Sequence, residues 1–81
     1  MTTEFAKQVM IGTAALLTTL AETGGGPESS LYLAIGSDIE VSNAVTSICA
    51  RKGWITNRAH WLEITSAGRE IANQINAAVS K

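Results

Sequence analysis

The chain has 81 residues, 46 % of them hydrophobic and 16 % charged, and a length of this order forms one domain with one modest core. We therefore predict a single domain over residues 1–81. Its one cysteine, Cys49, excludes an internal disulfide, and no second Cys or His stands at metal-ligand spacing, so we expect a cytoplasmic protein with no metal site and no cofactor.

The uncharged run Gln8–Ala21 raises the question of a membrane or export segment. It is shorter than the roughly 20 apolar residues that cross a bilayer, and no A-x-A cleavage pattern follows it. We interpret it as part of a buried helix and expect no membrane partner.

The net charge is −1, but the charges are unevenly distributed along the chain. Up to Ala50 there are one base and five acids, and from Arg51 onward there are five bases and two acids. An acidic first part and a basic second part indicate one face that suits anions.

The first predicted element is a helix over Thr3–Thr23, about 20 residues and roughly 30 Å long. Its apolar residues form a wide stripe, which predicts burial on more than one side. Gly24–Gly26 would end this helix in a flexible turn. A run of SLYLAI without clear period could be a strand in isolation. Because Pro27 suits a helix start and Gly36 a helix end, we predict a short helix over Pro27–Ile35.

The clearest local signal is Ser37-Asp38-Ile39-Glu40, in which Ser37 as N-cap and Glu40 three residues later form a capping box. A third helix therefore starts here. Two bases in its last turn suit the helix dipole, and Gly53 ends it by allowing a positive φ. Because only Gly36 and Ser37 separate the second and third helices, the two must meet at a steep angle, as in a helix-turn-helix unit.

Two short runs rich in β-branched and aromatic residues follow, Trp54–Thr56 and Trp61–Ile64, and Asn57–His60 between them suits a tight hairpin turn. Thr65 suits the N-cap of a last helix over Ser66–Val79, whose apolar residues form a second stripe. The sequence therefore predicts a mainly α fold with a small β-hairpin, in the order α-α-α-β-β-α.

Two motifs lie around this hairpin: Arg51-Lys52-Gly53-Trp54-Ile55 and Leu62-x-Ile64-Thr65-x-x-Gly68-Arg69. They resemble the basic-basic-Gly-apolar-Ile run and the strand followed by Leu-Thr-x-x-Gly-Arg of winged helix-turn-helix DNA-binding domains, in particular the multiple-antibiotic-resistance type of transcriptional regulator and its small relatives. With the helix order, the resemblance covers roughly Leu16–Ile75. It implies a winged helix-turn-helix fold, with the third helix in the major groove of double-stranded DNA and the hairpin wing on the backbone.

A recognition helix lays polar side chains in the major groove and keeps its other face in the core. The predicted DNA-binding residues on the third helix, opposite its apolar stripe, are Ser42, Asn43, Thr46, Ser47 and Arg51. At the helix end and on the wing, near a DNA backbone, they are Arg51 again, Lys52, Arg58 and His60. The alternative for the short polar residues is a solvated helix face, and for Arg51 and Lys52 it is a role in solubility and the helix dipole.

Trp54 and Trp61 have two interpretations. Exposed on the outer face of the hairpin, they would mark a partner surface. Otherwise the rings pack across the strands or on the end of the third helix. Cys49 is expected in the core, and Arg69 in a structural or phosphate-proximal position.

No nucleophile, base and orienting acid can be assembled from the sequence, and no glycine-rich loop follows a strand, so we expect no enzyme. We predict instead a small transcriptional regulator, or a phage- or plasmid-type accessory factor, that binds double-stranded DNA.

Excess apolar surface on the first and last helices predicts a homodimer, which would match a two-fold DNA site. This surface lies chiefly on Phe5, Val9, Met10, Ile75 and Val79. The alternative function is a winged-helix protein-interaction module without DNA binding, whose contact surface is the Trp54/Trp61 hairpin or the first helix. The net charge of −1 and the short wing favour this alternative.

Overall fold

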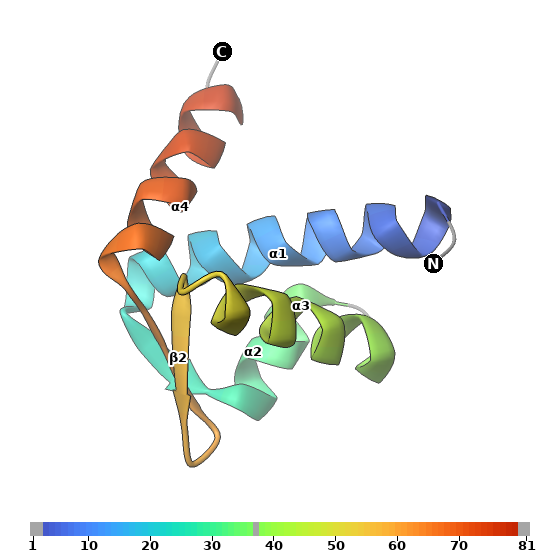
Figure 1. Cartoon of the computed structure of the whole chain (residues 1–81), viewed down its shortest axis with the longest axis horizontal. Coiled ribbons are helices and arrows are strands. Elements are labelled where there is room, and N and C mark those ends of the chain that lie inside the picture. Colours follow the sequence, from blue (N-terminus) through green and yellow to red (C-terminus); the bar gives the residue numbers. More distant parts are fainter. Residues whose placement is uncertain (1–2, 37, 80–81) are drawn as a thin grey trace.

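The computed structural model describes residues 3–36 and 38–79. Within these residues the chain forms four helices and one small three-stranded antiparallel sheet (Figure 1). In chain order the elements are α1 (Thr3–Thr23), β1 (Gly25–Pro27), α2 (Glu28–Ile35), α3 (Ile39–Arg51), β2 (Ile55–Arg58), β3 (Trp61–Ile64) and α4 (Ser66–Val79). The predicted order of helices and hairpin strands is confirmed, and one strand, β1, is added to it.

The glycine-rich segment ends α1 at Thr23, as predicted, and Gly24 forms a bend with φ 84°. Gly25 and Gly26 belong to a strand, so the prediction of a flexible turn over Gly24–Gly26 is wrong for these two residues. Residues 25–27 form β1 and pair antiparallel with β3, which becomes the central strand of the order β1-β3-β2. A Cβ atom on Gly25 would lie 2.9 Å from the backbone oxygen of Leu62 and 3.0 Å from the indole nitrogen of Trp61. The two strands approach so closely here that the position needs glycine.

The segment after β1 is the predicted helix, α2, and not a strand. It begins at Glu28, because Pro27 lies at the N-cap with φ −67° and ψ 140° rather than in the first helical turn. Gly36 ends the helix with φ 71°, and its N–H donates to the carbonyl oxygen of Tyr32 at 3.2 Å. Glycine adopts this left-handed conformation at little cost, which explains the stop at this residue.

The corner between α2 and α3 is short, as predicted, but the cap of α3 differs. Ser37, the predicted N-cap, lies outside the described residues. The helix begins at Ile39, and its N-cap is Asp38, whose carboxylate accepts a hydrogen bond from the N–H of Val41 at 3.0 Å. Glu40 then stands at the second helical position instead of the third, so the capping-box prediction is wrong.

The β2–β3 hairpin is longer than predicted. Asn57 and Arg58, which the sequence placed in the turn, belong to β2, and Arg58 lies opposite Trp61. Only Ala59 and His60 form the turn, with φ of 51° and 64°. Two consecutive residues at positive φ are typical of a type I′ turn, whose backbone twist matches that of the flanking strands.

The helix α1 lies at the centre of the core, where it packs against α2, α3 and α4. This arrangement confirms the burial on more than one side that its wide apolar stripe predicted. The core residues that are at most 2 % exposed are Leu16, Leu17, Leu20, Val41, Val45, Cys49, Ile55, Leu62 and Ala72. The first turns of α1 and the last turns of α4 extend away from this core in two directions (Figure 1).

Polar contacts of α4 join it to the rest of the domain. Thr65 caps α4 as predicted, because its Oγ1 accepts a hydrogen bond from the N–H of Gly68 at 3.1 Å and donates one to the carbonyl oxygen of Gly53 at 2.6 Å. Arg69 Nη1 donates to the carbonyl oxygen of Ala21 at 3.2 Å. Because α1 carries no base in its last turn, Arg69 supplies the cation that suits the negative end of that helix.

Candidate nucleic-acid interface

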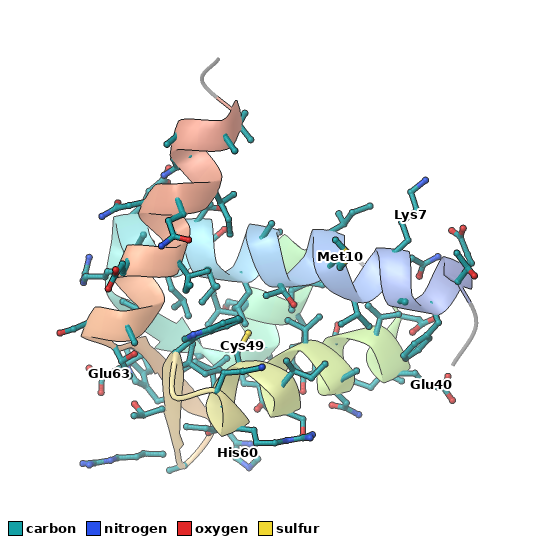
Figure 2. The ribbon with its side chains drawn as sticks, turned by 45° about the horizontal axis from the view of Figure 1, so that its top comes forward. Lys7, Met10, Glu40, Cys49, His60 and Glu63 are labelled. Carbon is teal, nitrogen blue, oxygen red and sulfur yellow. The ribbon has the colours of Figure 1, made fainter. Side chains whose placement is uncertain are left out.

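The exposed face of α3 is polar along most of its length. Its exposed residues recur three or four positions apart and therefore share one face. They are the apolar Ile39, which is 60 % exposed at the start of the helix, and Glu40, Asn43, Ser47, Ala50 and Arg51. Glu40 lies near the start of the helix (Figure 2), while the other end contacts β2. From Asn43 to Arg51 this row is about 12 Å long, at 1.5 Å per residue.

Two of the predicted contact residues do not belong to this face. The side chains of Ser42 and Thr46 are buried, with 1 % and 9 % of their surface exposed, so the expectation that they face outward is wrong. Thr46 Oγ1 donates within the helix, to the carbonyl oxygens of Ser42 at 3.1 Å and Asn43 at 3.2 Å. Because α3 contacts α1, α2 and β2, its buried arc is wider than its apolar stripe and includes both residues.

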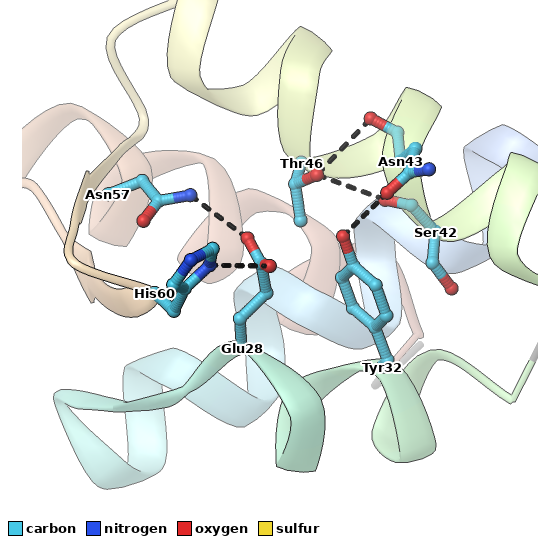
Figure 3. Close-up of polar contacts among 7 residues, drawn as sticks. All are labelled: Glu28, Tyr32, Ser42, Asn43, Thr46, Asn57 and His60. Atoms are coloured by element: carbon cyan, nitrogen blue, oxygen red, sulfur yellow. Dashed lines mark hydrogen bonds and ion pairs between the residues drawn. The ribbon is translucent and has the colours of Figure 1, made fainter.

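Asn43 is exposed and is held by a residue of α2. The hydroxyl of Tyr32 donates to Asn43 Oδ1 at 2.7 Å (Figure 3). Tyr32 could not be placed at the site from the sequence, because nothing local in the chain links two residues on different helices.

A second polar cluster links the hairpin to the start of α2 (Figure 3). The carboxylate of Glu28 accepts a hydrogen bond from Asn57 Nδ2 at 3.0 Å and lies 3.3 Å from Nδ1 of His60. The backbone N–H of Glu28 also donates to the carbonyl oxygen of His60 at 2.7 Å. The predicted contact residue His60 is thus exposed at the hairpin turn, but one of its ring nitrogens faces an acid that sequence reasoning missed.

The three other predicted backbone contacts are all exposed. Arg51 and Lys52 lie at the end of α3, and Arg58 lies at the end of β2 beside the turn. Within residues 3–36 and 38–79, no acid forms a salt bridge with any of the three. Their charges are therefore free to attract an anion such as a phosphate.

The two tryptophans line different cavities and do not form one patch. Trp61 is 48 % exposed and borders a cavity of about 370 Å³ together with Glu28, Tyr32 and His60. Trp54 is partly buried and borders the groove described next. An aromatic surface made of the two rings together is therefore not present on the hairpin.

An apolar groove of about 470 Å³ lies along α1 and α4, two helices that also contact each other. We call it the α1/α4 groove; its lining residues are Val9, Met10, Thr13, Ala14, Ile48, Trp54, Ile71 and Ile75. Of the residues predicted to pair between protomers, Met10 and Val79 are 73 % and 78 % exposed, Val9 is buried, and Phe5 and Ile75 are partly buried against the core. The apolar surface of these two helices therefore lines the α1/α4 groove, and its most exposed residues are Met10 and Val79.

Cys49 has no reactive character at neutral pH. It lies in the core (Figure 2), where burial raises the pKa of its thiol to about 11, although a hydrogen bond with Thr13 opposes the shift. The thiol therefore stays protonated, and a thiol is a much weaker nucleophile than a thiolate. In the described part of the chain, no three His, Cys, Asp or Glu side chains gather as a metal site would require.

None of the helices in residues 3–36 and 38–79 combines the length and the apolar character that crossing a membrane requires. The chain matches no known protein family, no curated protein and no solved structure.

Proposed function

We propose that the chain is a winged helix-turn-helix domain that binds double-stranded DNA as a small transcriptional regulator or a phage- or plasmid-type accessory factor. In this proposal the exposed face of α3 enters the major groove, and the β2–β3 hairpin is the wing that lies on the backbone. The domain binds DNA and catalyses no reaction.

The observation that supports the proposal is the row of exposed polar side chains on α3. This row ends near three basic side chains, Arg51, Lys52 and Arg58, none of which forms a salt bridge within the described residues. Asn43 and Ser47 offer hydrogen-bonding groups to base edges, and Arg51 reaches guanine or phosphate. Lys52 and Arg58 flank the end of that row, where the backbone of a duplex docked on α3 would pass. A helix with its side chains is about 10–12 Å in diameter, so α3 fits the major groove, which is roughly 12 Å wide.

The salt dependence of binding tests this proposal directly. Three phosphate contacts release counterions, so the logarithm of the binding constant should fall with the logarithm of salt concentration at a slope of about −2.7 per protomer. Between 50 and 200 mM salt, affinity for a fluorescent duplex should therefore fall about fortyfold if one protomer binds and about 1,800-fold if a dimer binds, as an anisotropy titration can measure. Failure to bind any duplex at low salt would refute the proposal.

A matched pair of charge-removing variants locates the contact. Arg51→Ala should weaken binding and reduce the salt slope by about one per protomer, because it removes one phosphate or guanine contact. Lys7→Ala is the control, because it removes the same charge from an exposed residue of α1. Lys7 lies on the opposite side of the molecule from His60 (Figure 2). Equal losses for the two variants would show that net charge, rather than this face, governs binding.

The proposed active form is a homodimer that meets through α1 and α4. No charged residue occurs in α1 from Gln8 to Ala21 or in α4 from Ile71 to Val79, and these stretches border the α1/α4 groove. Pairing two uncharged surfaces buries apolar area without desolvating charges, and it doubles the bases presented to a two-fold DNA site.

Sedimentation velocity tests the dimer with two equivalent variants. Met10→Glu places a charge on the α1/α4 groove and should yield monomers at concentrations where the parent chain dimerises. Leu33→Glu introduces the same charge at a residue of α2 that is 83 % exposed, and it should leave the dimer intact. A parent chain that stays monomeric at high micromolar concentration contradicts this part of the proposal.

A winged-helix protein-interaction module is the second candidate, and the position of Glu28 favours it. Its carboxylate lies between α2 and the hairpin, beside His60, where it would repel a phosphate. The apolar α1/α4 groove would then receive a protein partner, and binding to that partner would vary little with salt.

A further inference from the structure

The hydrogen bond between Tyr32 and Asn43 has a consequence for base recognition. Asn43 is exposed in the middle of the α3 face, whereas the ring of Tyr32 is partly buried against the core. The bond of 2.7 Å joins the Tyr32 hydroxyl to Oδ1, and the amide nitrogen of Asn43 is turned away from Tyr32 (Figure 3). Tyr32, the more buried of the two side chains, thus orients the amide of Asn43.

An asparagine amide has one acceptor and two donor hydrogens, and different bases need different parts of it. Adenine is read through both parts at once, because its N6 amino group donates to Oδ1 and its N7 accepts from Nδ2. Guanine presents two acceptors in the major groove, N7 and O6, and needs only donors. With Oδ1 turned toward the Tyr32 hydroxyl, the edge of Asn43 that faces outward is the donor edge.

We infer that Tyr32 is a specificity-determining residue, because it presents Asn43 to the major groove as a donor and so selects guanine over adenine at one base pair. The inference rests on the proposed function, since it needs α3 in the major groove. Tyr32 acts through Asn43 and does not itself touch the base.

The first experiment finds the base pair that Asn43 reads. Duplexes are selected from a random pool with the unaltered chain and with Asn43→Ala, and the position whose preference disappears in Asn43→Ala is the one sought. At that position the unaltered chain should bind guanine about fivefold more tightly than adenine, a discrimination at the low end of what one good side-chain contact gives.

The second experiment removes only the hydroxyl. Tyr32→Phe keeps the ring and frees Oδ1, so the preference for guanine over adenine should fall below about twofold or reverse. In the Asn43→Ala background the same change should have no further effect at this position, because the amide is absent. Ser30→Ala removes an exposed hydroxyl from α2, the helix that carries Tyr32, and it should leave the guanine preference unchanged.

The outcomes separate this inference from the proposed function. If the unaltered chain binds no duplex, both are overturned. If it binds and Asn43→Ala changes no base preference, or if Tyr32→Phe keeps the full guanine preference while its thermal unfolding stays cooperative, DNA binding stands and the role of Tyr32 is overturned. A Tyr32→Phe protein that unfolds at the parental temperature and loses the guanine preference supports the inference.

Discussion

Replacing Gly68 by alanine probes the close contact between α4 and the segment that leads into β2. A Cβ atom at this position would overlap the carbonyl oxygen of Trp54 and would lie 2.8 Å from Cγ1 of Ile64. The same carbonyl accepts a hydrogen bond from the N–H of Thr65 at 2.9 Å. Because the obstructing atom belongs to the backbone, a side-chain rotation cannot relieve the overlap, and α4 must move.

The expected destabilisation follows from these contacts. Overpacking against backbone costs about 1–3 kcal/mol, and displacing α4 weakens the Thr65 hydrogen bonds by about 1 kcal/mol. Alanine regains about 1 kcal/mol through its better helix propensity. We therefore expect Gly68→Ala to lower the free energy of unfolding by about 1–3 kcal/mol, which lowers the melting temperature of a domain of this size by roughly 5–25 °C.

Thermal unfolding followed by circular dichroism measures this change, and in a Trp61→Phe background the fluorescence of Trp54, then the one tryptophan of the chain, reports on the contact itself. Gly36→Ala is the control: a Cβ there meets no atom within 4 Å, so only its φ of 71° opposes the change, and the loss should be nearer 1 kcal/mol. A Gly68→Ala protein as stable as its parent would show that α4 does not approach the Trp54 carbonyl this closely.

Three further substitutions have defined expectations, each measured by chemical unfolding. Ser42→Ala should stabilise the domain by about 1 kcal/mol, since Ser42 Oγ is buried without a hydrogen-bond partner among the described residues; a loss of stability would reveal a partner. Arg69→Ala should destabilise it by about 1 kcal/mol by removing the hydrogen bond to the Ala21 carbonyl, and an unchanged midpoint would argue that this bond contributes nothing. Ala59→Asn should stabilise the hairpin turn by about 0.5–1 kcal/mol, because asparagine tolerates the φ of 51° better than alanine; equal midpoints would speak against strain at this turn.

The helices could be predicted from sequence because their signals are local. Gly36 and Gly53 both adopt the positive φ that their positions at helix ends predicted. The wide apolar stripe of α1 likewise predicted a helix with neighbours on several sides. Such features depend on residues within a turn or two of one another, so the chain itself carries the information.

The strand β1 could not be predicted, since Gly25-Gly26-Pro27 has no β propensity. It is a strand because β3 offers a free edge and because Gly25 allows the backbone to come close to Leu62. Both causes depend on a partner more than 30 residues away in the chain, and no local pattern shows them.

The candidate site was predicted in part. Asn43, Ser47, Arg51 and Arg58 are exposed as expected, but the burial of Thr46 depends on how α2 and β2 flank α3. The bond from Tyr32 to Asn43 spans 11 residues, and that from Asn57 to Glu28 spans 29. Contacts of this kind appear only when the elements are placed in space.

The buried thiol of Cys49 provides an internal probe of how often this domain opens. In an unfolded chain a cysteine has a pKa of about 8.5, so at pH 8 its thiolate fraction exceeds that of the native thiol by roughly two orders of magnitude. A thiol reagent therefore reacts almost only with molecules in which α3 has separated from α1. The labelling rate of the unmodified protein, with and without duplex DNA, thus measures how much a bound partner suppresses this opening.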